Sequence, residues 1–120
     1  MAVRAVRGAT QLKADDRDEM IDAVVELVGQ VLARNELTAD DLISVVFTST
    51  PDLVVEFPAA AARTLGIGDV PLLCAQELNV GGAMPRVVRL LAHVETPRSR
   101  AEIQHVYLRG AEVLRQDLAQ

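Results

Sequence analysis

The chain has 120 residues, half of them hydrophobic, and a formal net charge of −5 at pH 7. This length suits one domain with its own core, which must consist of Val, Leu, Ile and Ala because only two Phe and one Tyr are aromatic. The acidic balance argues against general nucleic-acid binding, which requires a basic face, and the single Cys excludes an intrachain disulfide and a CxxC zinc or redox site.

No apolar signal region opens the chain, and no apolar run approaches the ~20 residues of a membrane span. We therefore expect one soluble, cytoplasmic domain over residues 1–120 that binds neither nucleic acid nor membrane. His93 and His105 are too few for a His-rich metal centre, and neither a P-loop nor a dinucleotide fingerprint is present. We expect no metal and no cofactor.

The N-terminal third predicts a strand followed by a long helix. Residues 3–10 favour the strand, and Asp16 with Glu19 three residues later is typical of a capping box that opens the helix. Asn35 marks the end of the helix. Apolar residues recur between these points at helical spacing, namely Ile21, Val24, Val25, Val28, Val31 and Leu32.

The middle of the chain predicts three short elements after a capped turn at residues 38–41. A β-branched strand covers residues 43–50 and stops at Pro51. A short helix begins at Pro58, continues over residues 59–65 and ends at Gly66. A short apolar strand then covers residues 70–74.

Residues 75–85 predict a loop, and residues 86–94 allow two interpretations. As a helix, this segment would be lined by Val87, Val88, Leu91 and Val94; as a strand, it would place Val87, Arg89, Leu91 and His93 on one face. The strand is favoured because a Gly-rich loop precedes it and Pro97 follows it. An Arg on an apolar strand face requires a ligand anion or a partner carboxylate.

Ser99 and Glu102 predict a brief capped turn before a strand over residues 103–108, and a short helix follows. Because strands and helices do not alternate strictly, the expected class is α+β, a mixed sheet with one long covering helix, rather than a doubly wound sheet. So few helices leave one apolar sheet face uncovered, which predicts an oligomer that buries it.

The chemistry-bearing side chains suit a small dianionic substrate. Arg7, Arg89 and Arg115 can fork onto carboxylates, while Cys74, Glu77 and Tyr107 can distinguish hydroxyl groups. Taken singly, each has an ordinary alternative: a surface arginine, a buried thiol, a solvated carboxylate or a core phenol. No Ser-His-Asp set or other obvious acid–base machinery accompanies them.

Several short motifs stand in one order along the chain. They are Arg7-Gly8-Ala9-Thr10, Thr50-Pro51-Asp52-Leu53, Phe57-Pro58-Ala59, Cys74 with Gln76-Glu77-Leu78, Gly81-Gly82, Arg89, and a closing run of His105-Val106-Tyr107-Leu108 with Ala111, Val113-Leu114-Arg115 and Asp117-Leu118. Together they resemble the small single-domain chorismate mutases of the AroH type over essentially the whole chain. Each motif alone is weak evidence for this family, whereas the ordered set is specific for it.

The resemblance implies a homotrimer of the pseudo-α/β-barrel type with active sites in the clefts between subunits. It also implies the Claisen rearrangement of chorismate to prephenate in aromatic amino-acid (Phe/Tyr) biosynthesis. This reaction needs no nucleophile and no proton transfer, which agrees with the missing acid–base machinery.

The resemblance also assigns roles. Arg89 is placed at the ether oxygen and a substrate carboxylate, Arg7 and Tyr107 at the side-chain carboxylate, and Glu77 with Cys74 at the ring hydroxyl. The cleft would be lined by Leu73, Ala75 and Gln76, with apolar walls from Phe57, Ala59 and Leu114 and with Arg63 and Arg115 at its mouth.

Two departures from the family pattern affect substrate capture. Ala60 stands where relatives often carry Lys, and Gln116 follows Arg115 where Pro is common. Two rival hypotheses remain: a non-catalytic trimer that binds a carboxylate metabolite, and a small trimeric deaminase of reactive imines.

Overall fold

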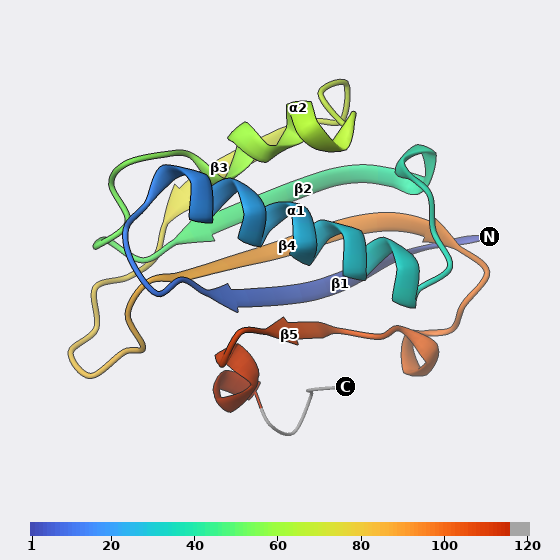
Figure 1. Cartoon of the computed structure of the whole chain (residues 1–120). Helices are drawn as coiled ribbons and strands as arrows, with labels where there is room; N and C mark the ends of the chain where they lie inside the picture. The colour runs from blue at the N-terminus through green and yellow to red at the C-terminus, as the bar shows by residue number, and fades with distance from the viewer. Residues whose placement is uncertain (116–120) are drawn as a thin grey trace.

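The computed structural model describes residues 1–115, without the side chain of Arg115, and shows a mixed five-stranded sheet covered on one face by a long helix (Figure 1). The order across the sheet is β3-β2-β4-β1-β5. The strands are β1 (Ala2–Gln11), β2 (Leu42–Ser49), β3 (Leu72–Gln76), β4 (Val87–Thr96) and β5 (Val106–Leu108). The predicted α+β class, with a mixed sheet and one long helix, is confirmed.

The helical elements are short except for α1 (Arg17–Arg34). The four-residue α2 (Ala62–Leu65) continues the 3₁₀ turn η2 (Pro58–Ala61) and ends at Gly66 in the left-handed conformation with φ 69°, as predicted. Three further 3₁₀ turns are η1 (Ala39–Asp41), η3 (Arg100–Glu102) and η4 (Ala111–Arg115). No helix within residues 1–115 is long and apolar enough to cross a membrane.

The central strand β4 resolves the ambiguity of residues 86–94 in favour of the strand. It pairs antiparallel with β1 over the whole of β1 and antiparallel with β2 on its other side. Its side chains alternate: Val88, Leu90, Ala92 and Val94 are buried, whereas Arg89, Leu91 and His93 are half-buried or exposed. Arg89, Leu91 and His93 therefore share one face, as predicted, although Val87 at the strand start is buried.

The helix α1 begins as predicted, with Asp16 accepting a hydrogen bond from the Glu19 N–H at 2.9 Å. The second half of the predicted capping box is wrong. The Glu19 carboxylate accepts instead from the N–H groups of Lys13 and Ala14, at 2.6 and 3.2 Å. It stabilises the chain that enters the helix, because these two N–H groups would otherwise lack a partner at the turn.

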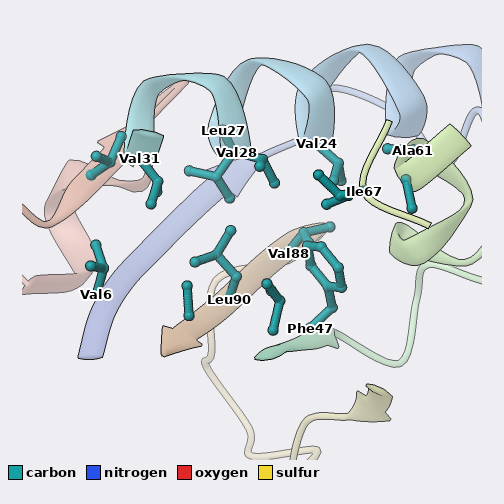
Figure 2. Packing of buried hydrophobic residues seen from close by; sticks show 14 of the residues in the cluster. Val6, Val24, Leu27, Val28, Val31, Phe47, Ala61, Ile67, Val88 and Leu90 are labelled. Carbon is teal, nitrogen blue, oxygen red and sulfur yellow. The ribbon is translucent and has the colours of Figure 1, made fainter. Parts of the chain in front are cut away.

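The core lies between α1 and the sheet, and Figure 2 shows Leu27, Val28 and Val31 of α1 above Val6 and Leu90 of the strands. The buried side of the helix is rotated from the predicted stripe. Its fully buried residues are Met20, Ala23, Val24, Leu27, Val28 and Val31, whereas Ile21, Val25 and Leu32 are only half-buried. Gly8 permits this close packing, since a Cβ there would lie 3.1 Å from Leu27 Cδ1 and 3.2 Å from Leu90 Cγ.

The last strand, β5, is shorter than predicted because side chains replace backbone partners at its start. Asn35 donates to the Gln104 carbonyl and accepts from the Gln104 N–H, at 2.9 and 2.7 Å. His105 Nδ1 accepts the Arg7 N–H at 2.9 Å. These contacts join the end of α1 and strand β1 to the segment that carries Tyr107. The segment is therefore held in position before it pairs with β1.

The sheet face opposite α1 is largely uncovered in the single chain. A small cluster of Ala9, Tyr107 and Ala111, with Leu114 against it, covers one end. Elsewhere on the same sheet face large apolar side chains are exposed, including Val3 at 59%, Leu73 at 61% and Leu91 at 39%. We call the sheet face opposite α1 the open face. It agrees with the expectation that one sheet face stays free.

Candidate active site

One row of residues crosses the open face and brings distant parts of the chain together. The strand register aligns Tyr107 with Ala9, Ala9 with Arg89, Arg89 with Thr48 and Thr48 with Ala75. Directly paired residues project to the same side of a sheet, so these side chains share the open face. Arg7, two residues before Ala9 on β1, joins them and pairs with Leu91.

A cavity of about 360 Å³ lies on this row, and we call it the arginine cavity. Its chemistry-bearing lining residues are Arg7, Thr48, Arg89 and Tyr107; Val46 and Leu91 are among its apolar ones. The structure thus brings together three of the predicted site residues, Arg7, Arg89 and Tyr107. Arg7 is exposed and Tyr107 is buried against Ala9 and Ala111, so Tyr107 is also a core residue.

Glu77 supplies the carboxylate that Arg89 was expected to require. Arg89 Nε lies 3.1 Å from Glu77 Oε2 and 3.3 Å from Oε1, and Thr48 Oγ1 donates to Oε2 at 2.7 Å. The Arg89 side chain is 42% exposed and that of Glu77 17%. A half-exposed guanidinium bound through Nε keeps Nη hydrogens available for a ligand anion.

A second cavity of about 320 Å³ lies where β2 and β3 end, and we call it the phenylalanine cavity. Its lining includes Phe57, which is 70% exposed, together with Cys74, Ala75 and Gln76. The loop before Phe57 is held by Asp15, whose carboxylate accepts from the N–H groups of Val54 and Val55 at 3.1 to 3.4 Å. An ion pair of Arg17 with Glu56 at 2.8 Å adds a second contact.

Within one chain the structure does not bring Cys74 to Glu77 and Arg89. Cys74 pairs with the buried Phe47 and packs against the core, whereas Ala75 pairs with Thr48 on the open face. Successive strand residues point to opposite sides, so the thiol faces away from the arginine cavity. Together with Phe57, Ala75 and Gln76, it belongs to the second cavity.

The remaining predicted residues are not among the lining residues of these two cavities. Ala59 is half-buried on η2, Arg63 is exposed on α2, and Leu73 is exposed on β3. Leu114 on η4 packs beside Tyr107. The backbone of Arg115 closes η4, whereas its side chain, together with Gln116 and the tail that follows, lies outside the described residues.

Sequence reasoning did not single out Thr48 or Val46, which also line the arginine cavity. The period-2 pattern of the predicted strand at residues 43–50 places both on one face. What no pattern within that strand reveals is that Thr48 lies directly beside Arg89. Among residues 1–115, no group of three or more His, Cys, Asp or Glu side chains is placed to hold a metal ion.

The arrangement offers fixed positive donors, one carboxylate, a phenol and a hydroxyl on one sheet face. Such a site can bind carboxylates and stabilise separated charge.

Comparison with known proteins identifies relatives along the whole described chain. The profile of the family described as chorismate mutase type I matches residues 3–118. A chorismate mutase AroH of Thermus thermophilus is 44% identical over 119 residues, covering 97% of this chain and 96% of its own length. That of Bacillus subtilis (strain 168) is 35% identical over 120 residues, covering 99% and 94%.

A solved structure supports the same relationship at the level of the fold. A chorismate mutase from Clostridium thermocellum superimposes with a TM-score of 0.90 at 39% identity, covering 92% of this chain and 98% of that one.

Proposed function

The chain belongs to the chorismate mutase type I family and converts chorismate to prephenate; from this premise we propose which residues perform the reaction and how the site is completed. The observation that carries the residue assignment is the Arg89–Glu77 pair on the open face beside Arg7 and Tyr107.

The reaction defines what the site has to do. A Claisen rearrangement within one molecule breaks a C–O bond and forms a C–C bond without nucleophile or proton transfer. The enzyme must hold the flexible enolpyruvyl chain over the ring and stabilise charge that separates as the bond breaks. The ether oxygen gains negative charge and the ring gains positive character.

Arg89 and Glu77 fit the two charges. The Nη hydrogens of Arg89 donate to the ether oxygen and to a substrate carboxylate, because Nε is occupied by Glu77. Glu77 faces the positive side of the ring and accepts the ring hydroxyl. Holding both charges in place before the reaction lowers the barrier, since little reorganisation is then required at the transition state.

Arg7 and Tyr107 bind the side-chain carboxylate at the other end of the cavity. Their positions on neighbouring strands support this role, since the register places Tyr107 beside Ala9, two residues from Arg7. Arg63 and Arg115 are assigned to the mouth of the cleft. Ala60 provides no cation at the rim, so Arg63 carries a larger part of substrate capture than the family pattern assigns to it.

The arginine cavity and the phenylalanine cavity of one chain are two halves of a complete site. The arginine cavity lacks the thiol and the aromatic wall, which lie in the phenylalanine cavity. We assign a homotrimer in which the phenylalanine cavity of one subunit, with Phe57, Cys74 and exposed Leu73, closes the arginine cavity of its neighbour. The uncovered apolar residues of the open face support this assembly. We place the trimer in the cytoplasm, in aromatic amino-acid biosynthesis.

The test follows loss of the chorismate diene absorbance, with prephenate confirmed as the product, for the wild type and for Arg89→Ala. We expect rapid turnover in the wild type and a loss of about 3–4 kcal/mol of transition-state stabilisation in the variant. Light scattering of the same samples should give a trimer.

Near-normal turnover of Arg89→Ala would contradict the role assigned to Arg89. An active monomer would contradict the assignment of the site to a subunit interface. A folded trimer that binds chorismate in calorimetry without turnover would instead support the rival binding protein.

A further inference from the structure

Thr48 contacts the Glu77 carboxylate, yet the proposed function gives its side chain no task. Its Oγ1 donates to Glu77 Oε2 at 2.7 Å. Thr48 pairs directly with Arg89 in the sheet, and both side chains line the arginine cavity. Two neighbouring strands therefore present two donors to one carboxylate.

Glu77 depends on these donors because it stands where the chain leaves the sheet. Its N–H bonds to the Ser49 carbonyl at 3.0 Å, just past the end of β3. The chain beyond it is solvated, with Leu78 87% exposed and Val80 62% exposed. A long carboxylate side chain in this position has several accessible rotamers, so its orientation must come from side-chain contacts.

The geometry at Arg89 shows what the hydroxyl achieves. An Arg–carboxylate pair frequently forms two parallel bonds, which occupy an Nη hydrogen as well as Nε. Here Arg89 Nε approaches both carboxylate oxygens, at 3.1 and 3.3 Å, while Thr48 occupies Oε2. The competing donor from Thr48 opposes rotation of the carboxylate into the two-bond arrangement and so keeps the Nη hydrogens for the substrate.

A hydroxyl is also the suitable chemical group at this position. It is neutral, so it orients the carboxylate without cancelling the negative charge that faces the ring. A Lys or Arg in its place would hold the carboxylate equally well but would add a positive charge where the ring becomes positive.

We propose that Thr48 is a positioning residue, whose hydroxyl orients Glu77 and, through Glu77, leaves the Nη groups of Arg89 free to act on the ether oxygen. The proposal rests on the proposed function of this site. It predicts an effect on kcat more than on KM, because both partners act on charge that develops in the transition state.

The experiment is a kinetic cycle with chorismate on Thr48→Val, Glu77→Ala and the double variant. We expect Thr48→Val, which preserves shape and removes the hydroxyl, to lower kcat about 10-fold with KM changed less than about 3-fold. Thr48→Ser should restore kcat to within about 2-fold of the wild type. In the Glu77→Ala background, Thr48→Val should change kcat by less than about 2-fold, since its partner is already absent.

The matched control is Ser44→Ala, on the same strand and face, whose hydroxyl contacts His93 at 3.2 Å away from the cavity. It should leave kcat within about 2-fold of the wild type. Circular dichroism and light scattering check each variant, and Thr48→Ala replaces Thr48→Val if that protein does not assemble.

Unchanged kcat in Thr48→Val would overturn the proposal, as would an equal loss in both Glu77 backgrounds, which would indicate packing alone. A wild type without turnover would instead overturn the proposed function, so the two failures are distinguishable.

Discussion

The arginine cavity and the phenylalanine cavity are built on different kinds of backbone. The arginine cavity stands on paired strands, where Arg89, Thr48 and Arg7 lie in continuous ladders. The phenylalanine cavity is bounded largely by the segment from Thr50 to Pro58, which lies outside the strands and is held by contacts to the start of α1 and to the start of β4. Arg89, which is proposed to meet developing charge, stands on the rigid part, and Glu77 is tied to that part by Thr48 and Arg89; electrostatic stabilisation is sensitive to small displacements. Phe57, which is proposed to enclose the substrate, stands on the loop, where shape matters more than exact bond geometry.

This contrast predicts that changes in the strand half lower kcat and that changes in the loop half raise KM. After Arg89→Ala, the largest effect should come from Arg89→Lys, which preserves the charge but removes the planar guanidinium. Lysine cannot contact Glu77 and two substrate oxygens in one plane, so we expect kcat to fall by about 100-fold. Steady-state kinetics, with trimer content as the control, measure it; a loss confined to KM would contradict the contrast.

The next effect should come from Phe57→Ala in the loop half. The variant loses the proposed contact of the exposed ring with the substrate, and burial of a Phe is worth about 1.5–3 kcal/mol, so KM should rise about 10-fold. The value of kcat should stay within about 3-fold of the wild type. An equal fall in kcat would show that the aromatic wall acts on the transition state.

A smaller effect should come from Asp15→Ala, a residue that is not among the lining residues of either cavity. The N–H groups of Val54 and Val55 lose their carboxylate acceptor, and the loop that presents Phe57 loosens. We expect KM to rise about 3-fold, with a stability loss of about 1 kcal/mol measured by denaturant unfolding. Asp18→Ala, on the first turn of α1 without such contacts among the described residues, is the matched control.

The smallest effect should come from Glu102→Gln in η3, before β5. Hydrogen bonds from the backbone and hydroxyl of Ser99 hold the pKa of Glu102 below its usual value of 4.5. A lowered folded-state pKa stabilises the protein above the unfolded pKa, and this contribution is lost as pH falls through the folded value. The melting temperatures of wild type and variant should therefore differ slightly at pH 7 and converge as the pH falls through the lowered folded-state pKa. A constant difference across that range would contradict this cause.

Much of the fold could be predicted from local patterns. Asp16 and Asn35 delimited α1, Gly66 ended the short helix, and alternation in residues 86–94 placed Arg89 with Leu91 and His93. The rotation of the buried helix face was missed, because Leu27 becomes the centre of the core only when Gly8 lets α1 approach β1. The second half of the capping box failed for a similar reason, since Glu19 finds nearer donors in the preceding turn.

The candidate site divides in the same way. Sequence by itself determined which chemical groups are available and the family to which the chain belongs, because ordered motifs and residue types are local properties. Only the tertiary structure decided that Thr48 lies beside Arg89, that Glu77 is shared between them, and that Cys74 faces away in the single chain. The physical reason is that a strand's period defines its two faces but not its neighbour or register, which depend on packing across the whole sheet.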